Sequence, residues 1–228
     1  MIRDVVKDLT VLGKRQVVLY LLGCVIFSLG AKCFIDSHLG VDPLDVQILG
    51  LSQHLHLTIG LTSGIVAISF LAVWSVWNRR LPLLSPFLTT FICGNLIDLW
   101  ILIRLEQVTQ KLFAPVALLI VGLILCAYAS SLIIMSGIGI RIMDLIAITM
   151  VTKWKWPFFA AKLVLEIYLC GSGWLLGGPV GVGTIAFIAL VGTLIQPFMA
   201  VNVRLLSIPN YGLAAARSGN ARTANQVV

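Results

Sequence analysis

The chain has 228 residues, of which 59% are apolar and 11% are charged, and its formal net charge is +7. Soluble domains carry about 25% charged residues, so this chain has too few polar side chains to cover a water-exposed surface. Its mean hydropathy of +1.03 also excludes a disordered chain, because disorder requires low hydrophobicity. The composition indicates an all-α polytopic membrane protein.

Six apolar windows have the length of about 20 residues that a helix needs to cross a membrane. Three of them begin with helix-start signals, because Pro115 and Pro157 open two windows and a Ser85-Pro86 pair opens a third. The first window is too long for the apolar part of a cleaved signal peptide, so we expect it to remain as an anchor. The six predicted spans are 16–35, 58–77, 86–103, 115–136, 157–176 and 184–203.

Two further stretches, 43–55 and 142–153, are predicted to form short helices between spans. A helix of about a dozen residues is roughly 18 Å long. That length is too short to cross a hydrocarbon core of about 30 Å. The sequence leaves open whether these helices dip into the bilayer or lie at its surface.

The chain matches itself at an offset of 99 residues, which becomes 98 after a one-residue slip. Each half then contains a span, a short helix and two more spans. Because three spans is an odd number, the second half is predicted to be inserted upside down relative to the first. Inverted repeats are typical of secondary transporters with a binding site between the repeats. The matching pairs are Gly23 with Gly122, Gly40 with Gly139, Asp45 with Asp144 and, after the slip, Gly94 with Gly192.

The basic residues predict the orientation, because Lys and Arg concentrate on the cytoplasmic side of membrane proteins. With six crossings and a cytoplasmic N-terminus, twelve of the sixteen basic residues are cytoplasmic. Arg104 and Lys111 are then external, and Lys32 and Lys162 lie within spans. The most economical position for Lys32 is one from which its ammonium group reaches the external surface. We therefore predict a multi-pass protein of the cytoplasmic (inner) membrane with both termini inside the cell.

The predicted organisation has four parts. A cytoplasmic segment 1–15 precedes a first membrane repeat, 16–105, and a second repeat, 113–204. The remaining segment, 205–228, is rich in Ser, Asn, Ala and Arg and is predicted to be a loose cytoplasmic tail.

Several motifs resemble the YczE/YyaS/YitT group of bacterial integral membrane proteins. A glycine turn followed by an aspartate at a helix start occurs at 39–45 and again at 137–144, and a Gly-Gly-Pro-x-Gly-x-Gly-Thr run occupies 177–184. The resemblance covers about residues 16–200, but the first half lacks the glycine-rich run at 79–86. It implies a multi-pass membrane protein, and for some members export or support of a small metabolite. It carries over no catalytic residue.

Ionisable groups inside a span cost at least a few kcal/mol unless they are paired or hydrated. Glu166 lies near the middle of a predicted span, and Lys162 lies four residues earlier on the same helical face. One interpretation is an intrahelical ion pair that packs against a neighbouring helix. The other is a midplane carboxylate facing a cavity, with Lys162 tuning its protonation or binding an anion.

Five further residues complete the predicted substrate or proton site. Asp98 and Asn95 either line the same cavity as Glu166, or Asp98 reaches water at the external interface. Asp45 and Asp144 each lie in the first turn of a short helix, where a carboxylate stabilises free N–H groups and could also bind a substrate or proton. Arg141 could bind a carboxylate or phosphate, or serve only as a cytoplasmic topology charge.

The sequence offers no cofactor or metal motif. The five cysteines form no CxxC pair, and the Walker, zinc-protease and hydrolase motifs are absent. We therefore expect a small secondary transporter, not an enzyme, whose partners are the lipid bilayer and a small polar solute, coupled to protons and without nucleic acid. The alternative is a non-transporting accessory or scaffold subunit of a biosynthetic or transport complex. A homodimer fits this size, although no residue argues for one.

Overall fold

The computed structural model describes residues 13–79, 84–205 and 207–211. Most of the predicted N-terminal segment 1–15 and of the predicted tail 205–228 therefore lies outside the described residues. So do five of the basic residues used for the orientation, namely Arg3, Lys7, Arg80, Arg217 and Arg222.

The described chain is helical, and six of its helices are long and apolar enough to cross a membrane. They confirm the six predicted spans, with boundaries that differ by a few residues. At the start of α7 and α9 the predicted proline signals operate, because Pro115 is the first residue of α7 and Pro157 is the N-cap of α9. The six helices are α2 (Lys14–Ser37), α4 (Ile59–Asn78), α5 (Leu84–Leu102), α7 (Pro115–Ser136), α9 (Phe158–Leu175) and α10 (Val182–Arg204).

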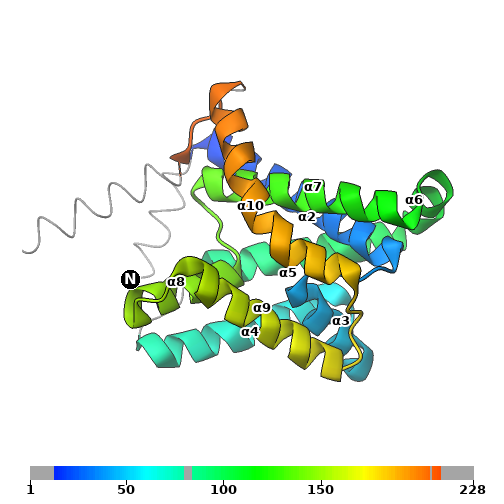
Figure 1. Cartoon of the computed structure of the whole chain (residues 1–228), viewed down its shortest axis with the longest axis horizontal. Coiled ribbons are helices and arrows are strands. Elements are labelled where there is room, and N and C mark those ends of the chain that lie inside the picture. Colours follow the sequence, from blue (N-terminus) through cyan, green and yellow to red (C-terminus); the bar gives the residue numbers. More distant parts are fainter. Residues whose placement is uncertain (1–12, 80–83, 206, 212–228) are drawn as a thin grey trace, which may run out of the picture.

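Three short helices complete the bundle. Two of them, α3 (Pro43–Leu55) and α8 (Ile142–Trp154), occupy the predicted positions and lie towards opposite ends of the molecule (Figure 1). The third, α6 (Glu106–Leu112), joins α5 to α7 and was not predicted. We call the two ends of the bundle the α8 end and the α6 end, after the short helices found there.

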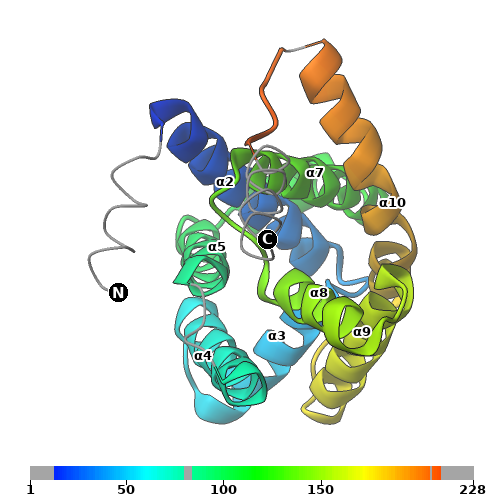
Figure 2. The ribbon, with the colours of Figure 1, turned by 90° about the vertical axis from the view of Figure 1, so that its left-hand side faces the viewer.

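The centre of the bundle is an antiparallel pair, α2 and α7, that run side by side (Figures 1 and 2). Glycines let the two backbones approach, as small residues do in membrane helices. A Cβ on Gly23 would lie 3.2 Å from the carbonyl oxygen of Ala129, and a Cβ on Gly122 would lie 2.9 Å from that of Gly30. The offset of 99 turns one contact into the other, since Gly23 corresponds to Gly122 and Gly30 to Ala129. This reciprocity agrees with the inverted relation between the halves, which stays a prediction.

The outer helices are arranged unequally on the two sides of this pair. Helices α4 and α5 pack against each other, and α3 packs along α9. Helix α10 packs on α7 but barely on α9. Figure 2 shows α9 and α10 well separated, and in Figure 1 they diverge towards the α8 end. The bundle is therefore shut between α4 and α5 and spread between α9 and α10.

The glycine-rich run forms a turn that brings α9 against α3. Gly177 adopts a left-handed conformation with a φ of +80°, and the turn is closed by a hydrogen bond from the Gly178 N–H to the Gly173 carbonyl oxygen. A Cβ on Gly178 would lie 2.1 Å from the carbonyl oxygen of Val46, which leaves no room for a side chain. The close approach of α3 explains the glycines of this turn.

Lys32 does not reach the surface as expected, since its side chain is only 2% exposed. It forms ion pairs with Asp36, one turn further along α2, and with Glu106 on α6, at 3.0 Å. Thr109 also donates a hydrogen bond to Asp36, at 2.8 Å. Helix α6 thus supplies a carboxylate and a hydroxyl group next to the end of α2. The charge of Lys32 is paired inside the protein, so its ammonium group does not have to reach water.

Candidate functional site

A buried arginine connects the two short helices at the middle of the molecule. Arg141 precedes α8, and its Nη1 donates to Asp42 Oδ2 at 3.4 Å, while its Nε lies 3.6 Å from Asp144 Oδ2. The guanidinium also lies over the rings of Phe27 and Phe187, 5.2 and 5.8 Å from their centroids. Arg141 is therefore held inside the bundle by two carboxylates and two aromatic faces, which is not the position of a topology charge.

Asp42, which the sequence analysis did not select, is the N-cap of α3. Its Oδ1 accepts hydrogen bonds from the N–H groups of Leu44 at 2.7 Å and Asp45 at 2.9 Å, and Pro43 follows at the first helical position. An Asp-Pro pair at a helix start is a recognisable capping signal. Because Asp42 is the N-cap, the Asp45 side chain does not cap α3. Asp144, its counterpart, forms ion pairs instead of a cap.

A cavity of about 620 Å³ lies in the space between α9 and α10. Its volume is within the range of about 300–1,000 Å³ that is usual for small-molecule sites. Its walls are mostly apolar, with Thr193 and Gln196 on α10 and three charged groups on α8 and α9. The charged lining residues are Asp144, Lys162 and Glu166.

Lys162 and Glu166 both line this cavity and do not form the intrahelical ion pair of the first interpretation. Lys162 Nζ instead lies 3.4 Å from Asp144 Oδ1, because α8 crosses beside α9 and offers a carboxylate already turned towards it. Glu166 is 6% exposed and makes no hydrogen bond or ion pair with any residue that the structure describes. Its carboxyl group is therefore available to a molecule that enters the cavity.

Asp98 and Asn95 lie elsewhere, between α4 and α5, and do not line the cavity with Glu166. The two Asp98 carboxylate oxygens accept hydrogen bonds from the N–H groups of Ile59 at 3.0 Å and Gly60 at 2.7 Å, so Asp98 caps the start of α4. Asn95 donates back to the carbonyl oxygen of Phe91, at 2.7 Å. Asp98 thus stabilises the α4–α5 contact, and neither residue lines the large cavity.

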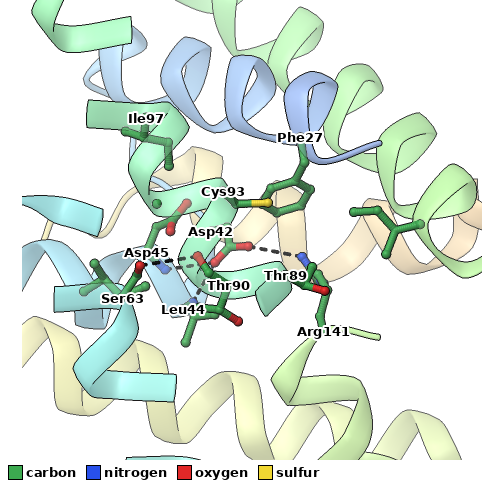
Figure 3. Close-up of a pocket in the computed structure, with 13 residues that line it drawn as sticks. Phe27, Asp42, Leu44, Asp45, Ser63, Thr89, Thr90, Cys93, Ile97 and Arg141 are labelled. Carbon is green, nitrogen blue, oxygen red and sulfur yellow. Dashed lines mark hydrogen bonds and ion pairs between the residues drawn. The ribbon is translucent and has the colours of Figure 1, made fainter. Parts of the chain in front are cut away.

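Asp45 lines a second, much smaller cavity of about 30 Å³, on the other side of Arg141 (Figure 3). Ser63 on α4 and Thr90 and Cys93 on α5 contribute to its walls. Asp45 is 7% exposed, and its Oδ2 has no hydrogen-bond partner in the described part of the chain. The volume is sufficient for about one water molecule.

The two cavities are joined by a row of charges. Asp42, Arg141, Asp144 and Lys162 are linked in that order by ion pairs of 3.4–3.6 Å. With Asp45 and Glu166 included, the cluster holds two more carboxyl groups than basic groups. Among the described residues no group of three or more His, Cys, Asp or Glu side chains could hold a metal ion. Such an excess of carboxyl groups could bind protons or an organic cation.

Comparison with known proteins agrees with this architecture. Residues 14–200 match the model of a family of unknown function, DUF6198. The chain belongs to this family. Its relatives include the uncharacterized protein YyaS of Bacillus subtilis, which is 28% identical over 184 residues, or 80% of this chain and 91% of the relative. No solved structure matches.

Two other relatives support the resemblance to the YczE/YyaS group. The uncharacterized membrane protein YczE of Bacillus subtilis is 26% identical over 208 residues, which cover 88% of this chain and 94% of YczE. A protein of Haemophilus influenzae is 25% identical over 202 residues, which cover 86% and 88% of the two chains. The chain is thus a multi-pass membrane protein of this group.

Proposed function

We propose that this protein is a secondary transporter that carries a small polar solute through the cavity between α9 and α10. The observation that supports this most is the difference between the two halves. The cavity on the α9–α10 side is open and charged, and the equivalent region between α4 and α5 has contracted around a space the size of one water molecule.

Residues that correspond to each other in the two halves show this difference between the α4–α5 and α9–α10 regions. Ser63 and Gly94 touch across the α4–α5 contact, since a Cβ on Gly94 would lie 2.2 Å from Ser63 Oγ. The residue 99 positions after Ser63 is Lys162, and the residue 98 positions after Gly94 is Gly192. Both line the large cavity, and a Cβ on Gly192 would meet no atom within 4 Å. A carrier built from inverted repeats alternates by exchanging such open and closed arrangements.

The distribution of basic residues indicates which end of the bundle faces the cytoplasm. The exposed basic residues at the α8 end include Lys14, Arg15, Lys153 and Lys155, and the α6 end has Arg104 and Lys111. The positive-inside rule therefore supports a cytoplasmic α8 end in the cytoplasmic membrane. Since α9 and α10 diverge towards that end, the conformation is inward-facing.

The cavity lining indicates the class of solute. The Glu166 carboxyl group forms no hydrogen bond or ion pair within the described part of the chain, and the Lys162–Asp144 pair lies in the same wall. A solute with an ammonium or guanidinium group would give Glu166 a charge-assisted hydrogen bond. The apolar side chains that make up most of the wall would cover the rest of the molecule. We therefore propose an organic cation or a zwitterion as substrate.

Solute uptake into proteoliposomes tests this function. The purified protein is exposed to a polar metabolite extract from bacterial cells, and the solutes that enter are identified by mass spectrometry. We expect at least one amine-containing solute to enter with the wild-type protein and not with Glu166→Gln. Glu106→Gln is the matched control, because it removes a carboxyl group outside the cavity. If no solute enters above protein-free vesicles, or if Glu166→Gln transports normally, the proposed function is wrong and the accessory-subunit alternative is favoured.

A further inference from the structure

We infer that Asp45 is the proton-carrying carboxyl group of the transporter and that the small cavity beside it is the coupling site. This inference rests on the proposed function, but it concerns a different group from the Glu166 carboxyl that faces the solute. It starts from the position of Asp45 in a cavity of about 30 Å³, which has room for a water molecule and not for an organic solute.

Asp45 forms no ion pair with a basic group that the structure describes, although Arg141 lines the same cavity. The Arg141 guanidinium is directed to Asp42 and Asp144, and Lys162 lies against Asp144. Asp42 Oδ1 is occupied by the N–H groups at the start of α3. The titratable groups that face Asp45 from its own loop and from the surrounding elements are Asp42, Arg141, Cys93 and Cys126.

An ionised carboxylate in such a place would be poorly compensated, because the Arg141 guanidinium is already shared by Asp42 and Asp144. Asp45 Oδ2 is inaccessible and has no hydrogen-bond partner among the described residues. Burying a charge without a partner costs far more than burying a neutral acid, so the neutral form is favoured. Asp45 therefore holds a proton in this conformation.

The hydroxyl groups of the cavity can accept that proton's hydrogen bond through a water molecule, for which the cavity has room. Ser63 donates its hydrogen to the carbonyl oxygen of Gly60 at 2.8 Å, and Thr90 donates to that of Pro86 at 3.0 Å. Their lone pairs remain available to the cavity that they line (Figure 3). A protonated Asp45 can donate to a water molecule held by such an oxygen, whereas an ionised Asp45 cannot donate.

The location gives the proton a route to either side of the membrane. The small cavity is shut by the α4–α5 contact, where Gly94 lies against Ser63, so separating these helices would expose Asp45 to the opposite side from the large cavity. On the other side Arg141 connects Asp42, next to Asp45, with Asp144 in the large cavity. A change of charge at Asp45 is thus transmitted to the wall of the solute cavity through Arg141.

Infrared spectroscopy tests the protonation without any substrate. We expect the difference between the spectra of the wild-type protein and Asp45→Asn, in an ester-free detergent at neutral pH, to contain the carbonyl band of one protonated carboxyl group. The matched variant Asp144→Asn should lose ionised carboxylate bands only, because Asp144 is paired with two cations. Asp45→Glu should keep the acid band at a shifted position. The inference is overturned if the spectrum of Asp45→Asn lacks an ionised carboxylate band of the wild type instead.

Proteoliposomes test the coupling. With the same metabolite extract, Asp45→Asn should lose accumulation driven by an inward proton gradient and keep the equilibrium exchange of preloaded solute. Gradient-driven accumulation that survives in Asp45→Asn would contradict the coupling role. A wild-type protein that exchanges no solute would contradict the proposed function, and the infrared result would still decide the protonation of Asp45.

Discussion

Arg141 is the residue on which the two halves of the molecule depend most. It is the counterpart of Asp42 at the offset of 99, so a basic and an acidic residue take equivalent places and pair across the centre. Because the two guanidinium contacts run to separate short helices, the pair also fixes the position of α3 relative to α8. Buried pairs of this kind are costly to break one partner at a time.

We predict that Arg141→Met strongly destabilises the protein, by about 3–5 kcal/mol, because it strands the Asp42 and Asp144 carboxylates. The double variant Arg141→Met/Asp144→Asn should recover part of this loss, since one stranded charge is removed. Thermal unfolding in detergent measures both. An Arg141→Met variant as stable as the wild-type protein would show that the ion pairs do not hold α3 and α8 in place.

At the scale of elements, the glycines of α9 provide a matched pair of substitutions. A Cβ on Gly173 would lie 2.5 Å from the backbone nitrogen of Gln47 on α3, whereas a Cβ on Gly171 would meet no atom within 4 Å. We predict that Gly173→Ala lowers the thermal stability by forcing α3 and α9 apart. Gly171→Ala should be neutral or stabilising by about 0.5–1 kcal/mol, the gain in helix propensity. Equal effects of the two substitutions would contradict the close α3–α9 contact.

The attachment of α6 is predicted to depend on pH. The hydrogen bond and charge of Lys32 hold the pKa of Glu106 below its usual value. A depressed carboxyl pKa contributes stability above the ordinary value for glutamate, and this contribution is lost as the pH falls through the pKa of the folded state. Hydrogen exchange at the α6 amides should therefore accelerate on acidification in the wild-type protein. In Glu106→Gln it should be faster at neutral pH and less dependent on pH over the same range.

The sequence predicted the elements better than the contacts between them. Apolar length alone places the six spans, and proline signals place two of their starts, because lipid forces the backbone into helices. Helix α6 was missed because it is short and polar. Lys162 was assigned to Glu166 by spacing, although Asp144 on another helix is its partner. Such pairings depend on how two helices cross, and the periodicity of a single helix gives no information about that crossing.

The candidate site was predicted in part for the same reason. Asp45, Asp144, Arg141, Lys162 and Glu166 were selected as charges that need an explanation in an apolar chain, and they gather around the centre of the bundle. Asp98 satisfied the same criterion, but its charge is used to cap α4. The difference between these roles follows from which backbone N–H groups are nearby, and that is a property of the assembled bundle.

In the whole molecule, the α9–α10 half is open while the α4–α5 half is shut. If the halves exchange these arrangements, closing α9 onto α10 would bring Gly192 against the α9 helix, as Gly94 now lies against Ser63. A large residue at position 192 should then block the exchange without preventing folding. We predict that Gly192→Trp retains the thermal stability of the wild-type protein and abolishes solute uptake, whereas normal uptake would show that this space need not close.

The most direct test of the central claim is cysteine labelling from each face of sealed vesicles of known orientation. Thr193→Cys places a thiol in the large cavity, in a Cys170→Ser background that removes the one native cysteine which is not fully buried among the five. A membrane-impermeant thiol reagent should label it from the cytoplasmic face and not from the outer face, since α9 and α10 diverge towards the α8 end, which we propose to be cytoplasmic. Labelling from the outer face alone, or from neither face, would contradict an inward-facing carrier.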